Sequence, residues 1–183
     1  VSFGNDGNIS QERLEDCINS DLANNYGNLC QRVTAFAIKN CNGKIPLEVK
    51  FHDEDLLILN KYKDNLDNIR SQIDNQNINF YIDYIVNSLF EANKYFNDQE
   101  PWKKKDDIIR LNTIVYTTLE IVRKISFLLY PIIPESSLKA LKIFDIEEKD
   151  VKLDTVSNNE YLKKGNNIHK IDILFKKIEK NND

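Results

Sequence analysis

Residues 78–96 read INFYIDYIVNSLFEANKYF. Along this stretch an apolar residue recurs at alternating steps of four and three, which is the spacing of one face of an α-helix. The pattern therefore predicts a long amphipathic helix that packs this face against other helices. The residues of the predicted face are Ile78, Ile82, Ile85, Leu89, Ala92 and Phe96.

The same helical spacing continues on both sides of this stretch. Ser10 and Asp53 are suitable N-caps for two of the upstream helices. Polar residues 75–77 predict a kink or a short break, and residues 97–102 predict a turn. The other predicted helices cover residues 13–20, 22–40, 54–73, 108–129 and 135–144.

This succession of helices, with almost no strand signal, predicts an all-α fold. The expected architecture is an antiparallel helical bundle of four to five helices joined by short connections. Residues 1–9 are expected to be a linker, residues 10–145 the bundle, and residues 146–183 a C-terminal arm. Apolar residues alternate between Ile171 and Phe175, so a short strand or an extended segment is predicted in the arm.

The bulk properties of the chain exclude several classes of function. The formal net charge of the 183 residues is −4, which argues against a protein that coats nucleic acid by bulk charge. A small RNA contact made by a few side chains is compatible with that charge. We find no apolar run long enough to span a membrane and no recognisable signal peptide. Because the chain starts at Val1 and contains no methionine, we expect an excised piece or a trimmed chain.

The cysteines and histidines suggest neither a metal site nor a catalytic site. Cys17, Cys30 and Cys41 are odd in number and lack the spacing of metal ligands. We expect them to be reduced, mostly packing thiols of a cytoplasmic protein, and no metal site is predicted. His52 and His169 have no neighbour that suggests catalysis, so both are expected at the surface.

The single tryptophan, Trp102, follows Pro101 in the predicted turn between two helices. Lys103, Lys104 and Lys105 come directly after it. A large ring beside cations can stack on an unpaired nucleic-acid base while the cations contact phosphates. An aromatic residue that closes the end of a bundle has the same pattern, and the Pro-Trp pair alone favours that structural role.

Asn28 and Arg32 lie four residues apart, so a helix would project both side chains from one face. Each precedes an apolar residue of the helical stripe, which places the pair at the border of the buried face. An amide and a guanidinium in such a place can read the edge of a base. For an arbitrary pair, bonding to water or to a neighbouring carboxylate is the commoner outcome.

Several short motifs resemble the anticodon-binding domain of bacterial methionyl-tRNA synthetases, which are class I aminoacyl-tRNA synthetases. The resemblance extends over nearly the whole chain, with the motifs in matching order. Cys30 and Gln31 depart from the family's pattern, as does the segment after Asp145. The matching motifs are Asp21–Asn24, Gly27–Leu29 with Arg32, Glu91–Tyr95, Glu100–Lys103, Leu128–Pro131 with Pro134–Glu135, Phe3–Gly7, and Leu174–Phe175 with Ile178–Glu179.

The resemblance implies specific roles for the residues singled out above. Trp102 would stack on a splayed anticodon base, Asn28 and Arg32 would contact the anticodon, and Pro101 would hold the turn. Stacking on an aromatic side chain contributes about 1–3 kcal/mol per base. Residues 103–105 would contact phosphates, a role that rests on their charge alone, since such a run is more often simply solvated.

The resemblance also implies what the parent enzyme does. It would attach methionine to tRNA(Met), recognised through the CAU anticodon loop, with ATP and Mg²⁺ as cofactors. A zinc site of the parent would lie outside this chain. The ATP-handling motifs of class I synthetases, His-Ile-Gly-His and Lys-Met-Ser-Lys-Ser, do not occur here. We therefore expect no catalysis and no cofactor in this chain, with tRNA(Met) and the parent's catalytic domain as partners.

Two other functions fit parts of the sequence. A helical protein-interaction or scaffold bundle suits the acidic balance, but the Asn28/Arg32 and Pro101/Trp102 motifs count against it. The anticodon-binding domain of a synthetase for cysteine, valine or isoleucine would share the bundle. The Pro-Trp pair favours the methionine enzyme.

Overall fold

The computed structural model describes residues 10–179, so the predicted linker at residues 1–9 lies outside the described residues. The regular elements in this range are all helical, which confirms the predicted fold class. The longer ones are α1 (Gln11–Cys17), a π-helical segment (Ile18–Gly27), α2 (Asn28–Asn40), α3 (Asp53–Asp64), α4 (Leu66–Asp74), α5 (Ile78–Gln99), α6 (Ile108–Leu129) and α7 (Pro134–Leu141). Single 3₁₀ turns or short 3₁₀ stretches occupy Pro101–Lys103, Lys142–Phe144, Glu148–Asp150 and Leu153–Ser157.

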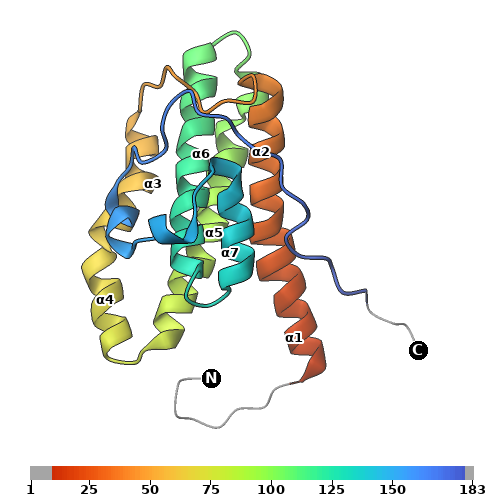
Figure 1. Cartoon of the computed structure of the whole chain (residues 1–183), viewed down its shortest axis with the longest axis vertical. Coiled ribbons are helices and arrows are strands. Elements are labelled where there is room, and N and C mark those ends of the chain that lie inside the picture. Colours follow the sequence, from red (N-terminus) through yellow and green to blue (C-terminus); the bar gives the residue numbers. More distant parts are fainter. Residues whose placement is uncertain (1–9, 180–183) are drawn as a thin grey trace.

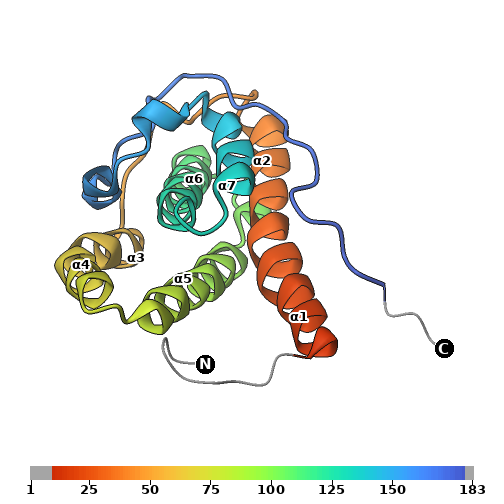
Figure 2. The same cartoon turned by 60° about the horizontal axis from the view of Figure 1, so that its bottom comes forward.

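Helix α6 is the centre of the fold. Viewed nearly along its axis, α6 is surrounded by α2, α3, α5 and α7 (Figure 2). Between Arg110 and Leu129 every residue except Asn112 is buried. The sequence pattern indicated a single apolar stripe along this helix, whereas the structure also buries its polar and charged side chains, including Glu120, Arg123 and Lys124. The first residue of that stripe, Ile108, is in fact 56% exposed.

The first two predicted helices are one continuous rod. The chain stays helical from Gln11 to Asn40, and its middle part is the π-helical segment. The separation predicted near residue 21 is therefore wrong, because no residue there breaks the helix. The wider π-helical turns instead bring Ala23, Tyr26 and Gly27 into the buried face.

The helix predicted after Asp53 is divided into α3 and α4. Asn65 ends α3, and its side-chain amide donates to the backbone oxygen of Lys61 at 2.8 Å. The N-cap of α3 is His52 rather than the predicted Asp53, because the carboxylate of Asp55 accepts from the His52 backbone N–H at 2.8 Å. The break predicted at residues 75–77 is confirmed between α4 and α5.

The turn after α5 begins later than predicted. Helix α5 continues to Gln99, three residues beyond the predicted end at Phe96. Glu100 then takes a left-handed conformation with φ 45°, and Pro101–Lys103 form a 3₁₀ turn. This turn lies at the end of the bundle that is drawn uppermost in Figure 1, between α5 and α6.

The C-terminal arm crosses the outside of the bundle without regular strand structure, as the blue trace of Figure 1 shows. The extended form of the predicted alternatives is therefore the one observed at residues 171–175. Gly27 faces the arm: a Cβ atom there would lie in ordinary contact with the Phe175 ring at 3.5 Å, and its tightest contact, 3.3 Å, would be with the backbone oxygen of Leu22 in the same helical rod. The Phe175 ring lies 6.2 Å from the Tyr26 ring.

Three fully buried charged residues of α6 fasten the arm to the bundle. Arg123 donates to the backbone oxygens of Thr155 (3.2 Å) and Asn158 (2.8 Å). Lys124 donates to the side chain of Asn159 at 2.9 Å and to the backbone oxygen of Val156. Glu120 accepts from the backbone N–H of Leu162 at 2.6 Å, and it also pairs with Arg123 at 2.8 Å. Buried backbone groups of the irregular arm are satisfied in this way.

The three cysteines are free thiols. Cys30 is buried, Cys41 is half-buried and Cys17 is exposed, so packing accounts for two of them. Burial raises the pKa of Cys41 to about 11 and that of Cys30 further. His52 and His169 are both exposed, which confirms their predicted place at the surface.

Candidate nucleic-acid interface

Trp102 stands at the tip of the bundle, in the 3₁₀ turn between α5 and α6. Its partner Pro101 is buried, whereas 40% of the surface of Trp102 is exposed. Proline fixes its own φ near −65°, which suits the first position of a helical turn. The buried proline thus anchors the turn, and the indole beside it remains accessible.

The indole of Trp102 is held against Phe96 of α5. The two ring centroids are 6.1 Å apart and the planes are inclined by 72°. This T-shaped arrangement is favourable for aromatic pairs. Phe96 is itself 2% exposed and packs edge-on against Phe36 of α2 at 5.8 Å. Trp102 is therefore supported by the core without being enclosed in it.

Arg32 of α2 contacts the same aromatic residue. The centre of its guanidinium lies 5.6 Å from the centroid of the Phe96 ring, within the range of a cation–π contact. Its Nη2 also donates to the side-chain oxygen of Asn97 at 2.7 Å. The structure thus brings Arg32 and Trp102, 70 positions apart in sequence, onto one phenylalanine.

Asn28 lies one helical turn before Arg32, as predicted, and it is exposed. Within residues 10–179 its side chain has no hydrogen-bond partner. Both its amide donor and its amide acceptor are therefore available to a ligand. Arg32, by contrast, is oriented by Phe96 and Asn97, and its other guanidinium donors have no partner among residues 10–179.

The three lysines after Trp102 are exposed but differ in their surroundings. Lys103 pairs with Glu100 at 2.7 Å. Lys104 and Lys105 are exposed and form no ion pair with any residue in the described part of the chain. Asp106 and Asp107 follow them directly, so the tip carries charges of both signs. A surface with charges of both signs attracts polyanions only weakly, so binding there would depend on a few specific contacts.

The sequence patterns did not identify Phe96 or Asn97 as parts of this site. Phe96 was placed on the apolar face of α5, which is correct, but its contact with two distant residues follows only from the packing of α2 against α5. Asn97 was assigned to a turn, whereas it lies in the last turns of α5 and bonds Arg32. No local signal in the sequence distinguishes either residue.

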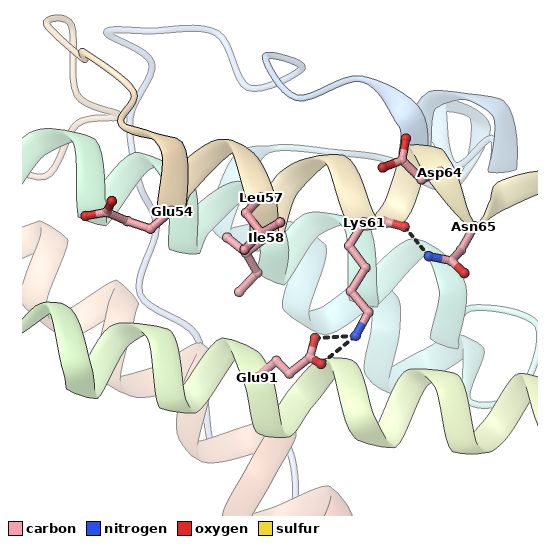
Figure 3. Close-up of a pocket in the computed structure, with 7 residues that line it drawn as sticks. All are labelled: Glu54, Leu57, Ile58, Lys61, Asp64, Asn65 and Glu91. Atoms are coloured by element: carbon pink, nitrogen blue, oxygen red, sulfur yellow. Dashed lines mark hydrogen bonds and ion pairs between the residues drawn. The ribbon is translucent and has the colours of Figure 1, made fainter.

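A groove between α3 and α5 offers less to a ligand (Figure 3). Leu57 and Ile58 form its apolar wall, and the charged groups Lys61 and Glu91 pair with each other across it. Asn65 donates to the backbone oxygen of Lys61. Three of the polar groups that line the groove are thus engaged with one another, and the groove holds no cluster of unpaired donors beside an exposed aromatic ring of the kind found at the Trp102 turn within the described residues.

No group of three His, Cys, Asp or Glu side chains within residues 10–179 is arranged to hold a metal ion. None of the helices in that range has the length and apolar character needed to cross a membrane.

A sequence profile described as "Anticodon binding domain of methionyl tRNA ligase" matches residues 45–183. The chain belongs to this family. The match includes the Pro101–Trp102 turn, and α2 with Asn28 and Arg32 precedes it. The resemblance inferred from short motifs is thereby confirmed.

Individual relatives extend the similarity to α2. The "Methionine--tRNA ligase" of Thermotoga maritima is 35% identical over 181 residues, covering 98% of this chain and 29% of that protein. The protein of the same name from Brucella suis is 38% identical over 147 residues, covering 80% of this chain and 28% of that protein. The chain therefore spans less than a third of the length of these curated relatives.

Solved structures agree with the fold. The apo form of Mycobacterium tuberculosis methionyl-tRNA synthetase matches with a TM-score of 0.91 and 32% identity, over 98% of this chain and 37% of that one. A second structure of that enzyme, described as in complex with methionyl-adenylate, matches with a TM-score of 0.89 over 96% of this chain. These structures have the same all-helical architecture in the matched region.

Proposed function

We propose that this chain reads the CAU anticodon of tRNA(Met) on behalf of a methionine–tRNA ligase of which it is one domain. The observation that carries the proposal is the shared contact of Trp102 and Arg32 with Phe96 at the tip of the bundle. A partly exposed indole and a guanidinium oriented by Phe96 and Asn97 lie together there, and aromatic stacking with directed hydrogen-bond donors is a common means of recognising unpaired bases.

The roles of the individual side chains follow from their surroundings. Trp102 offers a stacking surface for one splayed base, and Pro101 fixes the turn that presents it. Arg32 is a donor with a defined orientation, and Asn28 supplies one further donor and one acceptor. The guanidinium and the amide can together distinguish base edges, because hydrogen bonds in a fixed geometry reject the wrong partner. We assign the phosphate contacts to Lys103, Lys104 and Lys105, a role supported by their charge and exposure, although Lys103 is also paired with Glu100.

The rest of the proposed activity belongs to the parent chain. The parent would activate methionine with ATP and Mg²⁺ and transfer it to tRNA(Met) in the cytoplasm, and any zinc site would lie outside this chain. The Mycobacterium tuberculosis relative is described in complex with methionyl-adenylate, the intermediate expected of such a reaction. Within the parent, the bundle and its arm would contact the catalytic domain as well as the tRNA.

One titration tests the proposal directly. Trp102 is the only tryptophan, so its fluorescence reports the proposed stacking contact without a label. We expect an RNA stem-loop with a CAU anticodon to quench this fluorescence and to bind more tightly than a stem-loop of equal length with a scrambled loop. An equal response to the two RNAs, or none to either, contradicts the proposal and favours a protein-interaction bundle.

A further inference from the structure

A buried ion pair lies beneath the Trp102 turn. Arg110, near the start of α6, donates to both carboxylate oxygens of Asp55 in α3, at 2.5 and 3.0 Å. Asp55 is fully buried and Arg110 is 7% exposed. Asp55 also accepts from the backbone N–H of His52 (2.8 Å) and from the hydroxyl of Tyr95. This two-point geometry is the strongest form of an arginine–carboxylate contact.

The same guanidinium contacts the helix that carries the turn. Nη2 of Arg110 donates to the side-chain oxygen of Gln99 at 2.6 Å. Gln99 is the last residue of α5, and Trp102 follows three positions later. The ion pair between α3 and α6 therefore fixes the end of α5 immediately before the chain enters the turn.

The turn requires such a constraint. Glu100 has φ 45° and ψ 57°, a left-handed conformation that a residue with a side chain adopts at a cost of about 1–3 kcal/mol. A conformation of this kind persists only where the surrounding structure enforces it. Phe96 supports the turn through its contact with Trp102, and Arg110 holds Gln99, the residue directly before Glu100.

A stability role alone accounts poorly for this arrangement. Removing two charges from water carries a large desolvation penalty, and apolar residues of similar volume often stabilise a core equally well or better. What an apolar replacement lacks is a directed donor for Gln99. The geometry of the pair is therefore better explained by the need to orient the end of α5 than by the energy of burial.

We propose that Arg110 and Gln99, held by Asp55, are positioning residues that fix the orientation of Trp102 for base stacking. This inference rests on the proposed function and adds to it a set of residues that do not touch the RNA. These residues lie on α3 (Asp55), α5 (Gln99) and α6 (Arg110), so buried or half-buried groups would orient the exposed indole.

The decisive variant is Gln99→Leu, which removes the acceptor of Arg110 while leaving the Asp55–Arg110 pair intact. We expect the steady-state fluorescence anisotropy of Trp102 to fall and its quenching by acrylamide to increase in the free protein. We also expect the affinity for the CAU stem-loop to fall about three- to tenfold, because binding must then select one orientation of the ring. The urea midpoint of unfolding should change little.

Two further variants serve as controls. Gln72→Leu makes the same chemical change on α4, away from the tip, and should leave both the anisotropy and the affinity unchanged. Gln99→Glu keeps an acceptor oxygen at the same distance from the backbone, so its anisotropy should equal that of the wild type. This result would show that the effect of leucine comes from the lost hydrogen bond and not from its shape.

The outcomes separate this inference from the function on which it rests. The anisotropy is measured without RNA, so an unchanged anisotropy in Gln99→Leu overturns the positioning role whatever the RNA result. Failure of the wild-type chain to discriminate the CAU loop overturns the proposed function and is seen before any variant is made. A fall in anisotropy with unchanged RNA affinity also overturns the inference, because the orientation of Trp102 would then not matter for binding.

Discussion

The carboxylate of Glu120 accepts a hydrogen bond from the backbone N–H of Leu162, 42 residues further along the chain, at 2.6 Å. Both groups are buried, and the second oxygen of the carboxylate pairs with Arg123 at 2.8 Å. The arm that crosses the bundle is therefore part of the same hydrogen-bonded interior as the central helix. Loss of the arm would leave Glu120 and Arg123 paired with each other but would remove the backbone groups of the arm that Glu120, Arg123 and Lys124 contact.

Glu120→Gln should destabilise the fold strongly. The substitution keeps the shape of the side chain but leaves Arg123 buried without its counter-charge, which typically costs about 3–5 kcal/mol. The free energy of unfolding, measured by urea denaturation with circular dichroism, should fall by that amount. Glu160→Gln is a matched control, because Glu160 forms only an exposed pair with Lys164 and its loss should cost about 0–1 kcal/mol. Equal losses in the two variants would contradict the buried role of Glu120.

Lys124 should make the stability depend on pH. Burial, together with repulsion from Arg123, lowers the pKa of Lys124 to about 7, although Glu120 opposes this shift. The unfolded side chain titrates near its ordinary pKa of about 10.4. Between these two values the unfolded chain binds more protons at this residue than the folded chain, so the contribution of Lys124 to stability rises with pH. Below about pH 7 the residue is charged in both states, and the full cost of burying the charge is present.

The comparison with Lys124→Met isolates this effect, since all other titrating groups are common to both proteins. The free energy of unfolding of the wild type, relative to that of the variant, should increase by up to about 1.4 kcal/mol per pH unit above pH 7. A difference that stays constant between about pH 6 and about pH 9 would show that Lys124 retains its charge in the folded state.

Trp102→Ala should weaken RNA binding with little loss of stability. Loss of one stacked base corresponds to about 1–3 kcal/mol, or about ten- to hundredfold in affinity for the CAU stem-loop. In the intact parent enzyme, charging efficiency should fall by a similar factor. Binding of the variant can be followed with a fluorescently labelled RNA. Trp102→Phe retains a smaller stacking surface, so its affinity for the stem-loop should lie between those of the wild type and the alanine variant. An unaltered affinity in the alanine variant would refute the stacking role.

Arg32→Lys should reduce discrimination more than overall affinity. Lysine keeps the positive charge but lacks the planar set of donors that contacts Asn97 and the Phe96 ring together. The ratio of affinities for the CAU loop and a scrambled loop should therefore fall about fivefold or more, within the roughly 1–3 kcal/mol that a well-placed contact to a base contributes. Arg13→Lys, at an exposed position on α1, makes the same change away from the site and should leave the ratio as in the wild type.

Local sequence patterns predicted the helices well where a single residue type determines a boundary. The period of residues 78–96 and the polar break at 75–77 both correspond to the structure. The division of α3 from α4 at Asn65 could not be predicted. The side chain of Asn65 bonds the backbone oxygen of Lys61, but asparagine forms such bonds within helices as well as at their ends, so the residue type does not mark a boundary.

The charges of α6 show a more general limit of sequence patterns. Glu120, Arg123 and Lys124 would ordinarily mark an exposed face, yet all three are fully buried. Glu120 and Arg123 pair with each other at an i,i+3 spacing that is equally common on exposed helix faces. Their remaining partners and those of Lys124 lie 32 to 42 residues downstream in a segment without periodicity, so no local pattern indicates that these charges are buried.

The sequence allowed the individual residues of the candidate site to be proposed, but not their arrangement around Phe96. Trp102, Arg32 and Asn28 came from motifs of the family, and the structure places Trp102 and Arg32 on one ring. That the ring is Phe96, and that Arg110 bonds Gln99 directly before the turn, depends on the packing of helices that are distant in the sequence.

Helix α6 begins beside the Trp102 turn and ends at the opposite end of the bundle (Figure 1). Its 22 residues make it about 33 Å long, and close packing on all sides keeps it straight and stiff. A helix enclosed in this way cannot shift without disturbing the elements packed on it, so the position of the Trp102 turn at its start depends on the packing of the whole bundle.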